Sequence, residues 1–282
     1  MSAEALPYTL LVLLAELTVG GLWVLLAAQW RGASAESFVK FSAAMVPVLA
    51  AIAFVVAVSL DAKEEIDGYA VDTSWADPAR VALAAVLLLS LPYVVLTLRG
   101  DRVPAPGRAP AWALAAGGAA SLAGLAALGF LAAEFSEPAW GFPLVLASMV
   151  VGALVLGAVS LGMVLGHWYL VTPRLPEQPL REMTFWLLAA MALQALLIIP
   201  GVALPHDTIK GSVDTPILEN PFFYMRIGFG LAFPMLLAWM AYDSSRVRAM
   251  QSATGLLYIA MALVLAGELV GKGLMFTSAV PS

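Results

Sequence analysis

The sequence contains no cysteine and only two histidines, and both scarcities limit its chemistry. Without cysteine the chain forms no disulfide, holds no iron–sulfur cluster through thiolates and has no thiolate nucleophile. The two histidines, His167 and His206, limit any haem or metal site that the chain could build. Walker A, dinucleotide-binding and HExxH motifs are also missing. Hydrolysis catalysed by this chain alone is therefore not expected.

Charged residues are scarce as well, at 12% of the 282 residues, while 62% are hydrophobic. An average globular protein has about 25% charged and about 45–50% apolar residues. So little polar surface does not suit a water-soluble fold, and it argues against a soluble enzyme. The composition predicts an all-α integral membrane protein of a bacterial-type inner (cytoplasmic) membrane.

Eight continuously apolar runs are each long enough to cross a bilayer core of about 30 Å as a helix of about 20 residues. Strands of a membrane barrel would be about 10 residues long with alternating polarity, which these runs do not have. We therefore expect one transmembrane helical domain over residues 1–282. The expected helices are 7–30, 38–60, 80–98, 111–133, 141–171, 182–204, 221–242 and 252–276.

Basic residues are distributed unevenly between the two ends of these helices, which predicts their orientation. Of the 14 Lys and Arg residues, nine lie on the side reached after the first, third, fifth and seventh helices. The positive-inside rule then puts that side in the cytoplasm and both termini outside. The nine are Arg31, Lys40, Arg99, Arg102, Arg108, Arg174, Arg181, Arg246 and Arg248.

The loop at 61–79, which this orientation places outside, is acidic and also carries Tyr69 and Trp75. Two interpretations stay open: a docking surface for an extracytoplasmic partner, or a solvated loop.

Glycines and prolines inside the predicted helices indicate how these helices pack. The fifth helix has a series of small residues that would let a neighbouring helix approach closely. These are Gly152, Gly157, Gly162 and Gly166. Four other helices contain proline, which either breaks a helix near a cavity or kinks it. These are Pro47, Pro92, Pro200 and Pro234.

Charged side chains within the predicted helices are few, and each suggests function because a charge in hydrocarbon is costly. Glu16, Glu268 and Arg226 lie about 13, 12 and 8 Å below the outer ends of the first, last and seventh helices. Lys272 follows Glu268 by four residues, so these two can pair on one helix face. Glu16 and Arg226 then remain as partners for each other or for a ligand. The similar depths predict one buried cluster, which either neutralises charge between helices or forms a ligand or proton site. Gln194 near mid-membrane suits a helix–helix hydrogen bond.

His167 ends the fifth helix and His206 follows the sixth, which places the two at opposite membrane faces. About 30 Å of bilayer would then separate them, so a bis-histidine haem b is not expected. A haem held by His167 and one other ligand stays open, beside an interfacial hydrogen-bonding role. Arg174, near the same interface, would suit anionic lipid head groups or an acidic partner.

Two short segments carry a family resemblance: Ala15–Gly21 in the first helix and Gly267–Phe276 in the last. With eight helices and both termini outside, this layout resembles the membrane-anchor subunits of the dimethyl sulfoxide reductase and NrfD-like families. Those anchors have glycine after a polar residue early in helix one and a Glu–Gly–basic pattern in the last helix. The resemblance implies binding of menaquinone or ubiquinone without haem, beside iron–sulfur and molybdopterin subunits. This sequence has Lys272 where arginine is expected and Met275-Phe276 where an aromatic pair is more usual.

The leading hypothesis is a quinone-interacting anchor subunit of a respiratory or photosynthetic electron-transfer complex. Glu16 or Glu268 would accept a proton from quinol, and Arg226 or Lys272 would hold the quinone oxygen. The expected partners are lipids and an extracytoplasmic or cytoplasmic iron–sulfur or cytochrome subunit, with no nucleic acid. Whether the chain itself catalyses a reaction stays undecided. It would be either a non-catalytic subunit of an oxidoreductase complex or the subunit that holds its quinol site. Two alternatives remain: a secondary transporter or channel that uses the buried charges, and a haem-carrying or structural anchor.

Overall fold

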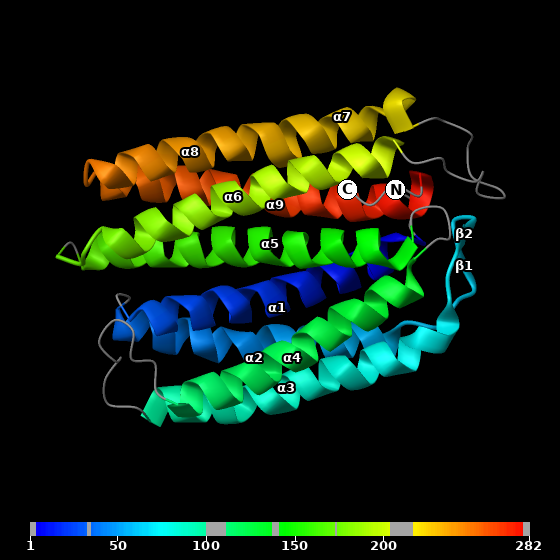
Figure 1. Cartoon of the computed structure of the whole chain (residues 1–282), viewed down its shortest axis with the longest axis horizontal. Helices are drawn as coiled ribbons and strands as arrows, with labels where there is room; N and C mark the ends of the chain where they lie inside the picture. The colour runs from blue at the N-terminus through cyan, green and yellow to red at the C-terminus, as the bar shows by residue number, and fades with distance from the viewer. Residues whose placement is uncertain are drawn as a thin grey trace.

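Long helices make up most of the computed structural model, which describes residues 4–32, 35–99, 111–136, 141–172, 174–203 and 217–278. They lie roughly side by side along the long axis of the molecule (Figure 1). In the described chain, eight helical segments are long and apolar enough to cross a membrane, as the composition predicted. The helices are α1 (Leu6–Arg31), α2 (Glu36–Ser59), α3 (Ala76–Arg99), α4 (Ala111–Glu134), α5 (Gly141–Val171), α6 (Gln178–Ala203), α7 (Pro221–Ile227), α8 (Phe233–Arg246) and α9 (Met250–Ser278).

The observed helices differ from the predicted ones mainly at their polar ends. Helix α3 begins at Ala76 rather than at 80, and α6 begins at Gln178 rather than at 182. The seventh predicted helix continues to Arg246 instead of ending at 242. A run of apolar residues marks only the part of a helix that hydrocarbon surrounds, whereas the backbone continues to hydrogen-bond through the polar turns beyond it.

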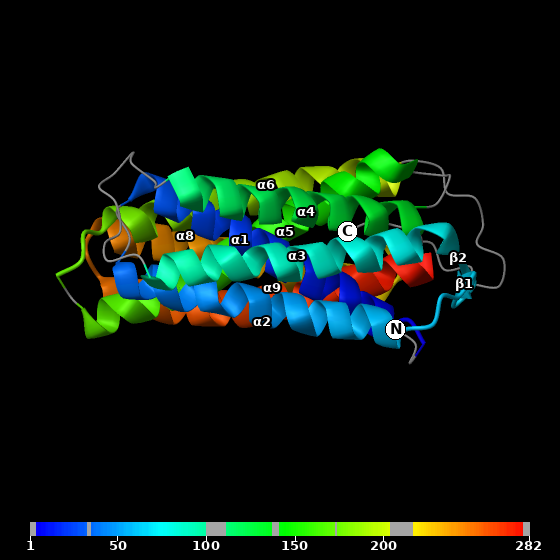
Figure 2. The ribbon, with the colours of Figure 1, turned by 90° about the horizontal axis from the view of Figure 1, so that it is seen from below.

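Helix α5 is the central helix of the bundle and packs against α1, α4, α6 and α9 (Figures 1 and 2). Its glycines allow the closest of these approaches. A Cβ on Gly157 would overlap the backbone of Gly20 in α1, and a Cβ on Gly20 would overlap the carbonyl of Ala153. A Cβ on Gly166 would lie 2.9 Å from Oγ1 of Thr254 in α9. The prediction of close helix packing is therefore confirmed at Gly157 and Gly166, whereas a Cβ on Gly162 would meet its nearest atom, Met183 Sδ, at an ordinary 3.7 Å.

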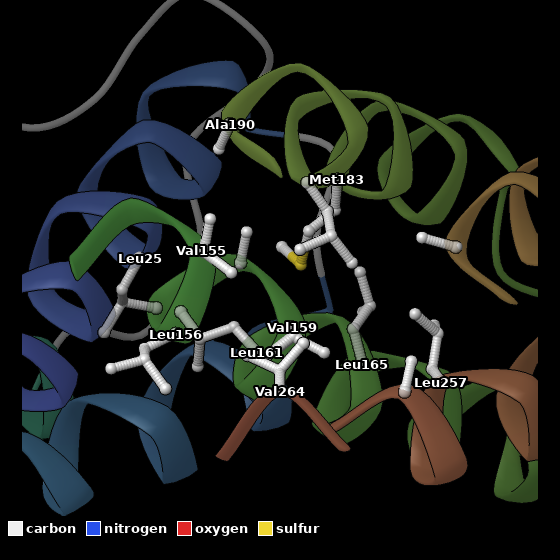
Figure 3. Close-up of a cluster of buried hydrophobic side chains, with 14 of the residues drawn as sticks. Leu25, Val155, Leu156, Val159, Leu161, Leu165, Met183, Ala190, Leu257 and Val264 are labelled. Carbon is white, nitrogen blue, oxygen red and sulfur yellow. The ribbon is translucent and has the colours of Figure 1, made fainter. Parts of the chain in front are cut away.

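Apolar side chains of α1, α6 and α9 pack around α5. Figure 3 shows Leu156, Val159 and Leu165 of α5 among side chains of α1, α6 and α9. Leu25, Leu257 and Val264 from these neighbours are fully buried. This interdigitation fixes the lateral positions of the helices, and so it fixes where their few polar residues meet.

The segment between α2 and α3 folds back over the end of the bundle that holds the start of α1 and the end of α9 (Figure 1). Strands β1 (Glu65–Ile66) and β2 (Tyr69–Ala70) pair antiparallel, and a 3-10 turn, η1 (Thr73–Trp75), follows. Asp67 and Gly68 have φ of 54° and 85°, as a two-residue hairpin turn requires. Hydrogen bonds from the Ser74 side chain and backbone lower the pKa of the Asp72 carboxyl.

Aromatic side chains attach this hairpin to the bundle. Tyr69 is fully buried, and its hydroxyl donates to the carbonyl of Phe135 at 2.6 Å. The ring of Phe276, near the end of α9, packs edge-on against Tyr69 and Phe135 at 5.7 and 5.3 Å. Trp75 stacks on Phe130 of α4. Tyr69 is thus part of the core, which excludes it from the docking surface considered above; burial of its ring outweighs exposure of the acidic residues beside it.

Prolines have different effects in different helices. Helices α2, α3 and α6 continue through Pro47, Pro92 and Pro200 as α-helices. Just before Pro234, by contrast, residues 228–232 form a π-helical turn, η3 (Gly228–Ala232), between α7 and α8. Single π turns often occur at functional sites, and this one begins two residues after Arg226.

Candidate functional site: a buried charge cluster

Four charged side chains from three helices meet inside the bundle. Glu16 lies on α1, Arg226 on α7, and Glu268 and Lys272 on α9. At most 2% of the surface of each residue is exposed. The prediction that these four residues converge is confirmed, and the adjacency of the three helices, which sequence could not show, follows from it.

The ion pairs differ from the expected ones. Lys272 Nζ lies 2.8 Å from Glu16 Oε1, and Arg226 Nη2 lies 2.9 Å from Glu268 Oε1. The expected pair within α9 is longer, with Lys272 Nζ 3.9 Å from Glu268 Oε2. Each close pair therefore joins two helices, and Glu16 and Arg226 are not partners of each other. Because α1 packs against α9, Glu16 lies nearer to the Lys272 ammonium than Glu268 does, although Glu268 is only one helical turn away on the same helix.

Gln194 of α6 is a fifth member that the sequence did not assign to the site. Its Nε2 donates to Glu268 Oε1 at 2.7 Å, and only 2% of the residue is exposed. The predicted helix–helix hydrogen bond of Gln194 is confirmed, between α6 and α9. Its depth in α6, about 14 Å from Ala203, was the available signal, because it is similar to that of Glu16 and Glu268.

The π turn explains how Arg226 is held. Pro234 has no backbone N–H, so it cannot make the helical hydrogen bond to the carbonyl of Gly230. Arg226 Nη1 donates to that carbonyl instead, at 3.3 Å. A Cβ on Gly230 would lie only 2.7 Å from the Cα of Gly267 in α9. Contact between these two glycines brings α7 close enough for the guanidinium to reach Glu268.

Helix α5 leaves space for the cluster without adding a charge. A Cβ at Gly152 would lie 2.9 Å from Glu16 Oε2, closer than carbon and oxygen normally approach. Glycine at this position therefore provides the room that the Glu16 carboxylate occupies.

Several polar atoms of the cluster retain hydrogen-bonding capacity. Glu16 Oε2, Glu268 Oε2, Gln194 Oε1 and Arg226 Nε are buried and have no hydrogen-bond partner among the described residues. Buried polar groups normally find partners, and an exception needs an explanation such as bound water or a ligand. Two carboxylates, a guanidinium, an ammonium and an amide can together bind a small polar group and exchange protons with it.

The other sequence candidates lie away from this cluster. His167 is exposed near the end of α5, and its Nδ1 lies 3.2 Å from the hydroxyl of Tyr258. Fifteen residues of α5, about 22 Å, separate it from Gly152. Arg174 is exposed in the turn after α5. His206 falls outside the described residues, and in the described ranges no three His, Asp or Glu side chains come together as metal ligands. A haem held by His167 and one other ligand stays an open alternative.

Comparison of the chain with models of known protein families, with curated proteins and with solved structures gives no match.

Proposed function

We propose that this chain is a quinone-interacting subunit of a membrane electron-transfer complex and that the buried charge cluster is its quinone site. The observation that carries the proposal is the set of four buried polar atoms without hydrogen-bond partners, on Glu16, Gln194, Arg226 and Glu268. A cluster whose only role was to neutralise charge between helices would gain by pairing these atoms with one another.

The chemistry of a quinone matches the donors and acceptors of the charge cluster. Its carbonyl oxygens accept hydrogen bonds, which Arg226 and Lys272 can donate. The hydroxyls of a quinol donate hydrogen bonds, and the free oxygens of Glu16 and Glu268 can accept them. Oxidation of quinol releases two protons and two electrons. The carboxylates would take the protons, and redox centres of a partner subunit would take the electrons, since the cysteine-free chain has no thiolate ligand for a cluster.

The direct test is to extract the purified protein with organic solvent and to separate the extract by chromatography. We expect about one menaquinone or ubiquinone per chain. Arg226→Gln and Gln194→Leu should lower the bound amount several-fold. A matched control is Tyr93→Phe. It removes a buried hydroxyl that donates to Gln29, outside the charge cluster, so this variant should still bind the quinone. Protein that holds no quinone, and takes up none when it is added, would contradict the proposal.

Glu16→Gln separates a working site from a structural one. The amide keeps the shape of the side chain, and its oxygen can still accept a hydrogen bond from Lys272, whose charge Glu268 also faces at 3.9 Å. The amide cannot, however, accept the proton. In membranes that contain the assembled complex, quinol turnover should fall while the amount of assembled protein stays similar. Less assembled protein with unchanged turnover per complex would indicate a structural role.

Transport of an ion or a small anion is a second candidate, and the irregular π turn next to Arg226 favours it. Interrupted helices and buried charges together are typical of transporter substrate sites. Proteoliposomes that contain the chain alone distinguish the two: a proton or anion flux abolished by Arg226→Gln would support transport.

A further inference from the structure

A groove of about 430 Å³ lies between α1, α5 and α6, and none of the residues of the charge cluster lines it. Its walls are the C-terminal half of α1 and the N-terminal half of α6, and Leu154 and Ala158 of α5 form its floor. Almost all of this lining is apolar, and tryptophan contributes at three positions. These are Trp23, Trp30 and Trp186.

The only charged residues among those that line this groove are Arg31 and Glu182, at its mouth. Arg31 is the last residue of α1, and Glu182 lies in the second turn of α6. Arg31 Nη1 lies 2.6 Å from Glu182 Oε2, and the Arg31 guanidinium also lies over the ring of Trp186. Both side chains stay partly open to the surroundings, at 48% and 27% exposed. One end of the groove is thus polar, with one charge of each sign, and the rest is apolar.

The size of the groove matches one lipid chain. Along α6 it runs from Pro179 to Leu193, which is about 21 Å at 1.5 Å per residue. One leaflet of a bilayer contributes about 15 Å of hydrocarbon, so the groove covers one leaflet and the interface beside it. A molecule with its polar head at Arg31 and its chain along α6 would fit the polarity from one end to the other.

We propose that this groove is a binding site for a phospholipid with an ethanolamine head group. The phosphate would bind the Arg31 guanidinium, which offers paired donors. The primary ammonium would donate to the Glu182 carboxylate, whereas the trimethylammonium of a choline head group has no N–H to donate. One acyl chain would lie between Trp23, Trp186 and Leu193. This site is independent of the proposed quinone site.

The test is native mass spectrometry of the delipidated protein, titrated with phosphatidylethanolamine, phosphatidylcholine or phosphatidylglycerol of the same acyl chains. We expect one bound phosphatidylethanolamine, held about tenfold more tightly than either other lipid, as a lost charge-assisted hydrogen bond implies. Glu182→Gln should abolish the preference over phosphatidylcholine. Equal affinity of the wild-type protein for the three lipids would overturn the head-group assignment.

Filling the groove tests its location. Ala189 lines the groove, so Ala189→Phe should weaken binding of all three lipids about tenfold or more. Ala126→Phe is the matched control, because Ala126 is exposed on α4 and does not line the groove. If Ala189→Phe does not fold, Ala27→Phe fills the groove from α1. Equal lipid binding by the filled variant and the control, or a quinone bound in the groove in place of lipid, would refute the proposal.

Discussion

Lys272 Nζ lies 2.8 Å from Glu16 Oε1 and so joins the last membrane-length helix to the first. The two residues are 256 positions apart in the sequence (272 minus 16), so only the tertiary fold brings them together. Both side chains are almost fully buried, so each charge depends on the other for its stability inside the bundle.

Removing the ammonium should therefore destabilise the protein strongly. We expect Lys272→Met to lower the free energy of unfolding by about 3–5 kcal/mol, because Glu16 is left as a buried charge without its partner. The double variant Lys272→Met, Glu16→Gln should lose much less, because it leaves no unpaired charge at that pair. Unfolding in a denaturing detergent compares the wild type with Lys272→Met, Glu16→Gln and the double variant. Additive losses in the double variant would show that the two residues do not interact.

Gly152→Ala should disturb the cluster from α5. The added methyl would lie 2.9 Å from Glu16 Oε2, so the carboxylate must shift from the position in which it pairs with Lys272. We expect a loss of about 1–3 kcal/mol, as for other overpacked cores, although alanine is the better helix former. Gly129→Ala in α4 is the control, since its Cβ would meet no atom within 4 Å. Equal unfolding temperatures of these two variants would contradict the prediction.

The hairpin should be held in place by the Tyr69 hydroxyl. Tyr69→Phe removes the hydrogen bond to the Phe135 carbonyl and should cost about 1 kcal/mol. Amide exchange of residues 64–71 measures the effect locally, and it should be faster in the variant than in the wild type. Tyr224→Phe, which removes an exposed hydroxyl bonded to Leu218, should leave exchange in the hairpin unchanged.

The distribution of basic residues predicts that the hairpin faces outward and that loop 99–110 faces the cytoplasm. Because the chain has no cysteine, single cysteines can be placed without interference. An impermeant thiol reagent added to intact cells should label Glu64→Cys and should not label Ala105→Cys; residue 105 falls outside the described residues. Labelling of Ala105→Cys from outside would show that the predicted orientation is wrong.

Parts of the charge cluster could be predicted from the sequence because depth in a membrane is a one-dimensional quantity. The positions of Glu16, Arg226 and Glu268 within their apolar runs gave similar depths at 1.5 Å per residue. The cost of isolated charges in hydrocarbon then favoured their convergence. Which residues form pairs could not be predicted, because pairing depends on the rotation of each helix and on its neighbours. The i,i+4 spacing of Glu268 and Lys272 suggested a pair that packing of α1 against α9 replaced.

By itself the sequence determined the eight helices of membrane-spanning length that the described part of the chain contains, since hydrophobicity and helix length are local properties of each segment. It also determined that α5 would accept close neighbours, since glycine has no Cβ whatever surrounds it. Only the tertiary structure decided that Gln194 joins the cluster, that Tyr69 is core rather than surface, and that α1 and α6 leave a groove between them. Each of these features depends on contacts between segments far apart in the chain, and those contacts follow from how whole helices fit together.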